Sequence, residues 1–330
     1  MRRKVIIDQD TLGPAGTNLQ AIALLLNAPD VEVLAITVPT GDHWRDQQVR
    51  HALRLLEIMG RTEIPVAPGA EMPLRCTPAA VAAWESLHGK LIYNGAWDLA
   101  RPGRWAEPRE VRDLPEGNPG TPPATEAAPE LIARLARAHP GEISLWCAAP
   151  FTNIALALAR EPRLPELIRE VHFMGGSFAP TTSAREFVQN PRREFNLRFD
   201  PEAAHAVLRT PWRKLVCAPI DISQNVHATA DLFARIARAG TPLAEYLDRF
   251  GRRDRPMWDE VAAATWIDPT LVTRTERHHL DVKTTPNAAW GETLSWPAGS
   301  SDAPGIAAEV QLTLDVPRFR DLFVALCSRP

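Results

Sequence analysis

The sequence predicts an α/β fold with a mainly parallel central sheet that is flanked by helices on both faces. Short apolar runs recur along the chain, at residues 5–7, 33–38, 143–147, 171–174 and 215–218. Stretches with helical periodicity separate them, at residues 19–26, 45–59, 128–138 and 201–208. Strands that alternate with helices are typical of a parallel sheet covered on both faces. Strands that are apolar throughout favour the same architecture.

We expect a single domain over residues 1–330. Residues 101–125 are rich in Pro, Gly and Glu and are predicted to form a long surface excursion rather than a domain boundary. Residues 291–305 form a second irregular segment. A late strand is expected at residues 312–315 and a closing helix at 318–327. No internal repeat is visible, so a repeat architecture is not predicted.

Composition excludes several classes of protein. The formal net charge is −3, so no overall field attracts nucleic acid or an anionic membrane. No apolar run approaches the roughly 18 residues of a membrane span. The four cysteines are far apart, which disfavours a disulfide framework or a zinc site and suits a reducing compartment. We therefore expect a cytoplasmic protein that binds neither nucleic acid nor membrane, and we expect a homo-oligomer, either a dimer or a tetramer.

Two acids, Asp8 and Asp10, directly follow the first predicted strand, Val5-Ile6-Ile7. Ligand sites of open α/β sheets gather at the carboxyl ends of their strands. Strand alternation puts both acids on the same side of the strand. Two carboxylates at such a short distance repel each other unless a cation or a shared proton lies between them. The pair therefore predicts a site at this edge, although a structural pair that caps the next loop is the alternative.

Three chemistries could use such a pair. Thr11, Gly13, Gly16 and Thr17 suggest a phosphate-binding loop, but neither glycine-rich nucleotide signature is present. Asp8-Gln9-Asp10-Thr11 resembles the D-x-D-x-T signature of haloacid-dehalogenase-type phosphatases, for which Lys214 could supply the later lysine, although no matching acidic motif follows it. A Ca²⁺ site is the third possibility, because this ion takes hard oxygen ligands from distant segments.

From Val5 almost to the C-terminus the chain resembles the inosine-uridine nucleoside hydrolase family. The similarity rests on short motifs that occur in the family's order. They are the opening D-x-D, residues 34–56 (L-A-I-T-V-P-T-G-D, then R-H-A-L-R-L-L), A-P-F-T-N-I-A at 149–155, M-G-G at 174–176, E-F-N at 194–196, D-P-E-A-A at 200–204, and the closing Asp315-Val316 with Arg318-Phe319. The resemblance implies a Rossmann-like nucleoside hydrolase fold and an N-glycosidase that acts on ribonucleosides.

The resemblance also implies roles for individual residues. Asp10 matches the carboxylate that binds Ca²⁺ and activates the attacking water, and Asp259 matches a late metal ligand. Ala148 stands where the family supplies a backbone carbonyl to the metal, a role that needs no particular side chain. The positions that match contacts to ribose or base are Asp42 (where the family usually has Asn), His88, Met174, Glu194 and Asn196.

Two departures from the family pattern bear on activity. The family's D-x-D-P-G-x-D-D is replaced by a longer loop in which Asn18 and Gln20 stand near the positions of the last two acids. Amide oxygens can coordinate Ca²⁺, but the lost charges should weaken binding. We expect one of these amides, not both, to reach the metal. The family's His-Asp pair reads Trp258-Asp259, which resembles the purine-preferring branch, in which indoles stack on the base.

The sequence therefore predicts a hydrolase that cleaves the N-glycosidic bond of ribonucleosides, preferentially purine ones, with a Ca²⁺-activated water as the nucleophile. A role in purine salvage follows from that substrate. A non-catalytic nucleoside- or ribose-binding protein on the same fold is the main alternative, because a fold does not fix an activity. The phosphatase is the second alternative.

Overall fold

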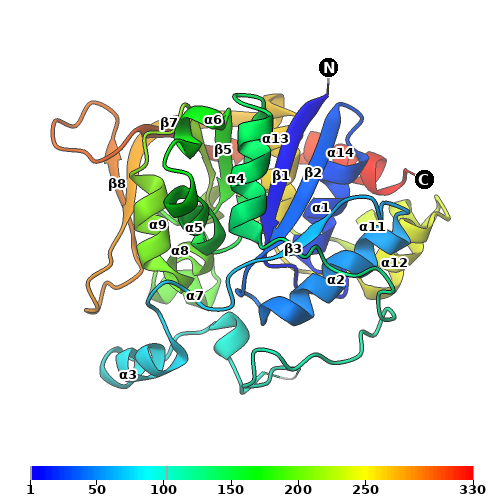
Figure 1. Ribbon diagram of the computed structural model, residues 1–330, viewed down its shortest axis with the longest axis horizontal. Helices are drawn as coiled ribbons and strands as arrows, with labels where there is room; N and C mark the ends of the chain where they lie inside the picture. Colours follow the sequence, from blue (N-terminus) through cyan, green and yellow to red (C-terminus); the bar gives the residue numbers. More distant parts are fainter. Residues whose placement is uncertain (1, 102, 330) are drawn as a thin grey trace.

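A nine-stranded sheet organises the chain. The computed structural model describes residues 2–101 and 103–329, and its strands lie in the order β3-β2-β1-β4-β5-β6-β9-β7-β8 (Figure 1). All neighbours from β3 to β9 are parallel, whereas β7 is antiparallel to both β9 and β8. The strands are β1 (Arg3–Gln9), β2 (Val31–Val38), β3 (Val66–Pro68), β4 (Ile143–Ala148), β5 (Glu170–Met174), β6 (Leu215–Ala218), β7 (Val272–Val282), β8 (Thr293–Pro297) and β9 (Ala307–Leu314).

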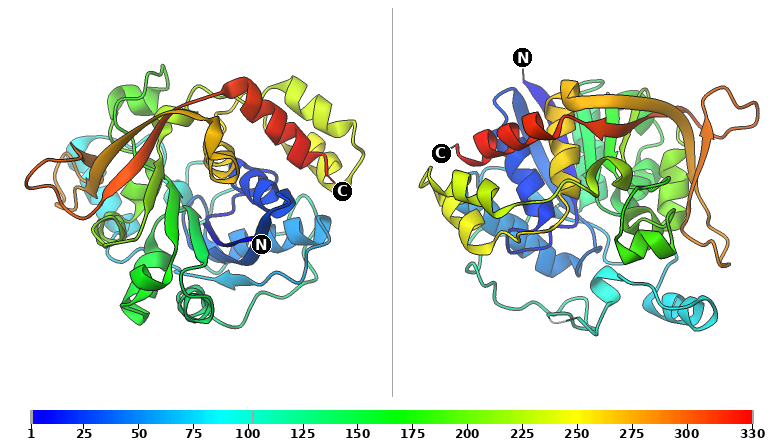
Figure 2. Two further views of the ribbon diagram at one scale, coloured as in Figure 1. Left: turned by 90° about the horizontal axis from the view of Figure 1, so that it is seen from above. Right: turned by 180° about the vertical axis from the view of Figure 1, so that it is seen from behind.

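Helices cover both faces of the sheet, as the sequence predicts. Val5 and Ile7 point to one face and Ile6 to the other, so β1 contributes to two separate cores. The first core is covered by α1 (Thr17–Asn27), α2 (Arg45–Ile58), α13 (Trp258–Ile267) and α14 (Val316–Cys327), with α11 (Ala230–Ala237) and α12 (Pro242–Phe250) beside them (Figure 2). The second is covered by α4 (Ala128–Ala138), α5 (Thr152–Arg160), α6 (Leu164–Leu167) and α9 (Pro201–Leu208).

Two central helices, α1 and α13, have sequences that are apolar almost all round, and their buried position explains why. Residues 18–26 of α1 are all buried, because α1 packs against α13 and α14 as well as beneath the sheet. Residues 259–266 of α13 are buried in the same way. A helix that is apolar on every side belongs in the interior of a protein. The N-termini of α1 and α13 consequently lie together at the carboxyl edge of the sheet.

The carboxyl ends of the parallel strands face a collection of short elements (Figure 1). These elements are α3 (Pro78–His88), η1 (Gly95–Trp97), α7 (Arg185–Gln189), α8 (Phe195–Phe199) and α10 (Ile220–Ser223); a further short element, η2 (Pro269–Leu271), follows α13. Residues 101–125, apart from residue 102, which is not described, form neither helix nor strand, as expected for the excursion. They run along α2: Arg54 donates to the Glu116 carbonyl at 3.0 Å, and Gln47 accepts from the Arg112 amide at 2.8 Å.

The C-terminal third differs from the sequence prediction in detail. The expected strands and helices up to residue 218 are present, and the late strand is β9, which begins earlier, at Ala307. Residues 291–305 are not wholly irregular, since they contain β8. The long strand β7 was not predicted, because its first half (V-T-R-T-E) is largely exposed and carries no alternating apolar pattern. None of the described helices is both long and apolar enough to cross a membrane.

Candidate active site

A cavity of about 910 Å³ opens at the carboxyl edge of the sheet. Its walls combine residues from β4 and β5, the loops after β1 and β2, the N-termini of α1 and α13, α7, α8 and the excursion. The residues predicted for the site that line this cavity are Asp10, Asn18, Gln20, Asp42, Ala148, Met174, Glu194, Asn196, Trp258 and Asp259.

Asp10 lies at the floor of the cavity, directly after β1, and is only 1% exposed. Its two carboxylate oxygens accept hydrogen bonds from the Asp42 backbone N–H at 2.8 Å and from Asn18 Nδ2 at 3.1 Å. A Cβ on Gly41 would lie 2.2 Å from Asp10 Oδ2, so only glycine permits this close approach of the loop after β2. Burial raises the pKa of Asp10 well above its usual range, and the Asp42 and Asp259 carboxylates raise it further.

Asp259, which is distant from Asp10 in the sequence, also lies at the floor of the cavity. It occupies the first turn of α13, where its Oδ2 accepts from Gln9 Nε2 at 2.9 Å and its backbone N–H donates to Thr17 Oγ1 at 3.3 Å. The packing of α1 against α13 therefore fixes Asp259 against the end of β1. Burial raises the pKa of Asp259 well above its usual range, and the neighbouring Glu260 adds to the shift.

Asp8, the other member of the D-x-D pair, is not among the residues that line the cavity. Its carboxylate is fully buried and accepts hydrogen bonds from Thr37 Oγ1 at 2.6 Å and Asn153 Nδ2 at 2.7 Å, which join β1 to β2 and α5. Lys214 precedes β6 at the opposite, amino edge of the sheet and pairs with Glu309 at 3.2 Å. The arrangement that a phosphatase would need, with Asp8 exposed and Lys214 beside it, is therefore contradicted.

The loop after β1 places its two amides differently. Asn18 Nδ2 donates to Asp10 and, at 3.3 Å, to Asp42 Oδ2, whereas its Oδ1 is buried and has no partner among the described residues. Gln20 Oε1 is likewise buried without a partner among the described residues, but Gln20 Nε2 donates to the Ala15 carbonyl at 2.8 Å, within its own loop. Of the two amides, only that of Asn18 contacts the acids.

Oxygen donors from four segments could hold a metal ion here. The described residues contain no group of three or more His, Cys, Asp and Glu side chains arranged to bind a metal, so a site would have to combine acids with neutral oxygens. Such a set is supplied by Asp10, Asp259, the Asn18 amide and the Ala148 carbonyl. Because the buried Asn18 Oδ1 accepts no hydrogen bond from a described residue, it is available to a cation. An all-oxygen set of this kind fits Ca²⁺ rather than zinc.

The predicted ribose contacts surround the end of β5. Asn196 Nδ2 donates to the Met174 carbonyl at 3.2 Å, which fixes the amide at the cavity wall. Glu194 is the N-cap of α8 and accepts backbone hydrogen bonds from Asn196 at 2.7 Å, Leu197 at 3.1 Å and Gly176 at 2.9 Å. Burial raises the pKa of Glu194 to about 7. Its carboxylate thus has a structural role in addition to facing the cavity.

The two residues predicted to lie near the base differ in their position relative to the cavity. Trp258 lines the cavity, and its Nε1 donates to Gln224 Oε1 at 2.9 Å, which fixes the plane of the indole. His88 does not line the cavity. It lies exposed at the end of α3, with its ring centroid 5.0 Å from that of Trp84. The interpretation of His88 as a site residue is therefore not supported by this arrangement.

Several cavity residues were missed by the sequence analysis. The Tyr93 hydroxyl donates to Asp42 Oδ1 at 2.7 Å, and Arg104 and Trp105 come from the excursion. The excursion was predicted to be a surface segment, but it forms one wall of the cavity. Tyr93 and Arg104 lie in irregular chain, where no periodicity marks an inward-facing side chain. The one available signal was the rarity of tyrosine, which occurs twice in the sequence.

The arrangement as a whole is suited to hydrolysis of a polar substrate. A buried carboxylate with a raised pKa can accept a proton from water, and oxygen donors beside it can hold a cation. Donors and acceptors on the surrounding walls can orient a sugar, and an indole can stack on a planar group.

Comparisons with known proteins agree with this geometry. Residues 5–321 match the sequence model of the inosine-uridine preferring nucleoside hydrolases. A pyrimidine-specific ribonucleoside hydrolase, RihA of Citrobacter koseri, is 30% identical over 84% of this chain and 83% of its own. An inosine-uridine preferring nucleoside hydrolase of Crithidia fasciculata is 28% identical over 89% of this chain and 88% of its own.

The fold is shared with solved structures. A purine-preferring ribonucleoside hydrolase from Gardnerella vaginalis superposes with a TM-score of 0.76 at 23% identity, over 99% of this chain and 98% of the other. The family match spans nearly the whole chain and includes the segments that build the cavity. This chain belongs to the inosine-uridine preferring nucleoside hydrolase family.

Proposed function

We propose that the chain hydrolyses the N-glycosidic bond of purine ribonucleosides, releasing free base and ribose, with Ca²⁺ at the cavity floor. Family membership supports ribonucleoside hydrolysis in general. The observation that carries the proposal is the meeting of Asp10, Asp259 and Asn18 on one floor of a cavity that Trp258 also lines.

Asp10 accepts the proton of the attacking water in this mechanism, a role worth roughly 10²–10⁴-fold in rate. Asp10, Asp259, Asn18 and the Ala148 carbonyl would hold the cation, and Gln20 is left out because its amide bonds to Ala15. When bound, Ca²⁺ supplies Lewis-acid activation of water. Met174, Glu194, Asn196 and Asp42 orient the ribose, whose C1′ develops oxocarbenium character as in other glycoside hydrolyses.

The purine preference rests on Trp258. An indole has no proton to donate to the base near neutral pH, but its face can stack on a planar ring. Purines have the larger π surface and gain more from such stacking. The names of relatives do not decide the base, since they include a pyrimidine-specific and a purine-preferring enzyme. A role in purine salvage would follow, and the four buried, unpaired cysteines support the cytoplasm as its location.

One observation favours a second candidate, a nucleoside-binding protein without catalysis. The amides of Asn18 and Gln20 stand near positions where the family has acids, so the floor carries less negative charge to hold a cation. A protein of this kind would bind a ribonucleoside in the cavity and release it unchanged.

Incubation with a panel of inosine, adenosine, guanosine, uridine and cytidine, with Ca²⁺ or with a chelator, separates the two candidates. Chromatography for free base should reveal purine release that depends on Ca²⁺. Saturable nucleoside binding by calorimetry without base release would favour the binding protein. Faster release of uracil than of hypoxanthine would contradict the purine preference while leaving hydrolysis intact.

A further inference from the structure

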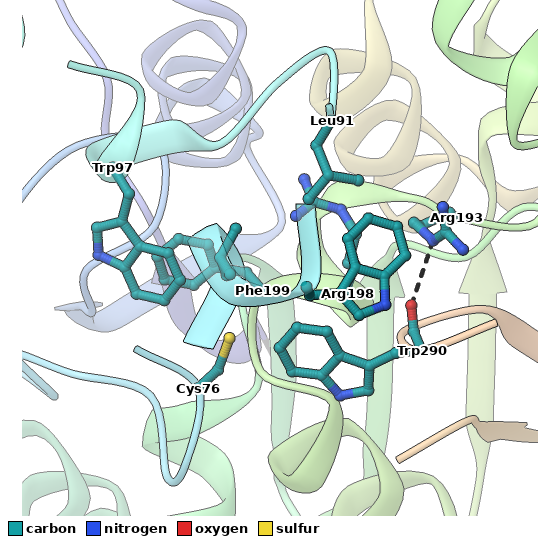
Figure 3. Close-up of a pocket in the computed structure, with 9 residues that line it drawn as sticks. Cys76, Leu91, Trp97, Arg193, Arg198, Phe199 and Trp290 are labelled. Atoms are coloured by element: carbon teal, nitrogen blue, oxygen red, sulfur yellow. Dashed lines mark hydrogen bonds between the residues drawn. The ribbon is translucent and has the colours of Figure 1, made fainter. Parts of the chain in front are cut away.

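Residues 91–97 contribute Ile92 and Tyr93 to the cavity lining and are anchored at both ends. Leu91 packs against an aromatic cluster that includes Trp84 and Trp290, and Trp97 stacks on Phe199 with ring centroids 4.3 Å apart (Figure 3). Between these anchors, Arg198 Nη2 donates to the Tyr93 carbonyl at 2.6 Å. The segment is therefore held in one position relative to the sheet.

The same segment is locked to the loop that carries Asp42. The Ala96 amide donates to the Gly41 carbonyl at 2.9 Å, and Gly95 has a φ of +55°. A Cβ on Gly95 would lie 2.4 Å from the Gly41 carbonyl oxygen, so no other residue fits. The carbonyl of Gly95 consequently has a fixed direction, and it accepts a hydrogen bond from Arg104 Nε at 3.2 Å.

Arg104 is half-buried in the cavity wall, and its charge is not neutralised by an ion pair. The only hydrogen bond of its side chain to a described residue is the one from Nε to Gly95, and no described carboxylate pairs with its guanidinium. The other two arginines of the excursion that line the cavity form ion pairs: Arg101 pairs with Asp98, and Arg112 pairs with Glu110. The Nη groups of Arg104 are free to bind a ligand.

The Gly95 carbonyl that Arg104 contacts belongs to the segment that is bonded to Gly41, the residue before Asp42. Burial raises the pKa of Asp42, and the Tyr93 hydroxyl and then the Arg104 charge act against that rise. Asp42 in turn contacts Asp10 through its backbone, so the guanidinium stands on the wall above the catalytic floor. A purine ring stacked on Trp258 with its C1′ at that floor lies within the same cavity as this cation.

We propose that Arg104 binds the leaving base and stabilises the negative charge that develops on it, which makes 6-oxopurine ribonucleosides the preferred substrates. The proposal rests on the function proposed above. Trp258 cannot act as an acid, so the base must depart with the electron pair of the broken bond. In hypoxanthine and guanine this charge spreads onto N7 and O6, and a guanidinium can bind these two acceptors with two parallel N–H groups. A guanidinium has no acceptor, so it cannot bond to the 6-amino group of adenine in this way.

The step balances without an added reagent. The oxygen of water bonds to C1′ while the C1′–N9 bond breaks, and the electron pair of that bond passes to the purine. Asp10 takes the proton of the water. The purine anion, paired with Arg104, takes a proton from solvent on release, and Asp10 returns its proton to solvent.

The test compares Arg104→Gln and Arg104→Lys with Arg109→Gln on three substrates: inosine, adenosine and p-nitrophenyl β-D-ribofuranoside. Arg109 belongs to the same excursion but is exposed, pairs with Glu71 at 3.2 Å and does not line the cavity, so it is the matched control. The p-nitrophenolate leaves as a stable anion without help. Thermal unfolding of each variant verifies that it is folded.

We expect Arg104→Gln to lower kcat/KM for inosine by about 10²-fold, the scale of an oxyanion donor. Its kcat/KM for adenosine and for the p-nitrophenyl riboside should fall by no more than about threefold, on the same reasoning. Arg104→Lys should recover part of the inosine loss, and Arg109→Gln should match the unmodified chain. Equal losses on all three substrates, or no loss on inosine, would overturn this inference alone. An unmodified chain that cleaves none of the three would overturn the proposed function and the inference together.

Discussion

The floor and the wall of the cavity are built in different ways. The floor consists of Asp10, Asn18 and Asp259, which the register of β1 and the packing of α1 against α13 fix in place. The wall consists of Tyr93, Arg104 and Trp105. These residues lie in irregular segments of the chain, which aromatic contacts hold in place. Asp10 and Asp259 of the floor match the family pattern, whereas Asn18 departs from it and the wall residues lie outside the motifs of the resemblance. Catalysis should therefore depend on the floor, whereas the choice of leaving base should depend on Arg104 of the wall together with Trp258.

The largest effect should come from the floor. Asp10→Asn removes the group that accepts the water proton, so kcat should fall by about 10³-fold, within the range for general-base catalysis. Nucleoside affinity, measured by calorimetry, should change little. In the wall, Asp113→Asn should alter kcat by less than about twofold, because that carboxylate bonds only to Asn118 and surface effects of this kind are small. Unchanged turnover in Asp10→Asn would remove Asp10 from the mechanism.

Stability should vary with pH because of a buried acid beside the floor. Glu194 has an ordinary pKa of 4.5 that burial raises to about 7, so the folded state binds more protons than the unfolded state between these values. Its contribution to the free energy of unfolding should therefore fall as pH rises through this window, by about 3 kcal/mol. Urea unfolding without Ca²⁺ at pH 5 and pH 8 measures the difference. Glu194→Gln should make the dependence less steep without abolishing it, because burial also raises the pKa of Asp8 and Asp200 to about 6 and of Glu260 to about 8. An equally steep dependence in that variant would assign it to these other groups.

The loss of Trp258 and the loss of Trp105 should have different effects: the first should change the preference between bases, and the second should lower stability. Trp258→Ala should cost about tenfold to a hundredfold on inosine and little on uridine, since stacking on a base is worth about 1–3 kcal/mol. Trp105 packs against His43 with ring centroids 4.2 Å apart and donates to the Glu110 carbonyl at 2.8 Å. Trp105→Ala should lower the unfolding temperature and reduce activity on both bases equally. Equal losses on both bases in Trp258→Ala would make that indole a packing residue.

The smallest effect concerns the amides of the loop after β1. Asn18→Asp adds a carboxylate beside Asp10 and should tighten Ca²⁺ binding by about tenfold, or ~1.4 kcal/mol, since affinity rises with ligand charge. Gln20→Asp should change it little, because Gln20 is directed toward Ala15. Calorimetric titration of both variants with Ca²⁺ provides the comparison. A tighter site in Gln20→Asp alone would reverse the assignment.

The sequence predicted the floor better than the wall for a physical reason. Strands that are apolar throughout specify their own burial, so the end of β1 could be identified as a position at the edge of the sheet. The family resemblance then supplied Asp10 and Asp259. Tyr93 and Arg104 depend on contacts of Leu91, Trp97 and Gly95 with distant chain, which no local pattern encodes. For the same reason, the sequence could not show that His88 lies outside the cavity lining, since the direction of α3 is set by tertiary packing.

The most direct test of the central claim is to follow one oxygen atom. Inosine is incubated with the chain and Ca²⁺ in H₂¹⁸O, in the absence of phosphate, and the products are analysed by mass spectrometry. The account predicts free hypoxanthine and ribose that carries a single ¹⁸O at C1, formed in equal amounts and abolished by Asp10→Asn. Recovery of intact inosine, or release of hypoxanthine only when phosphate is added, would contradict hydrolysis at this site.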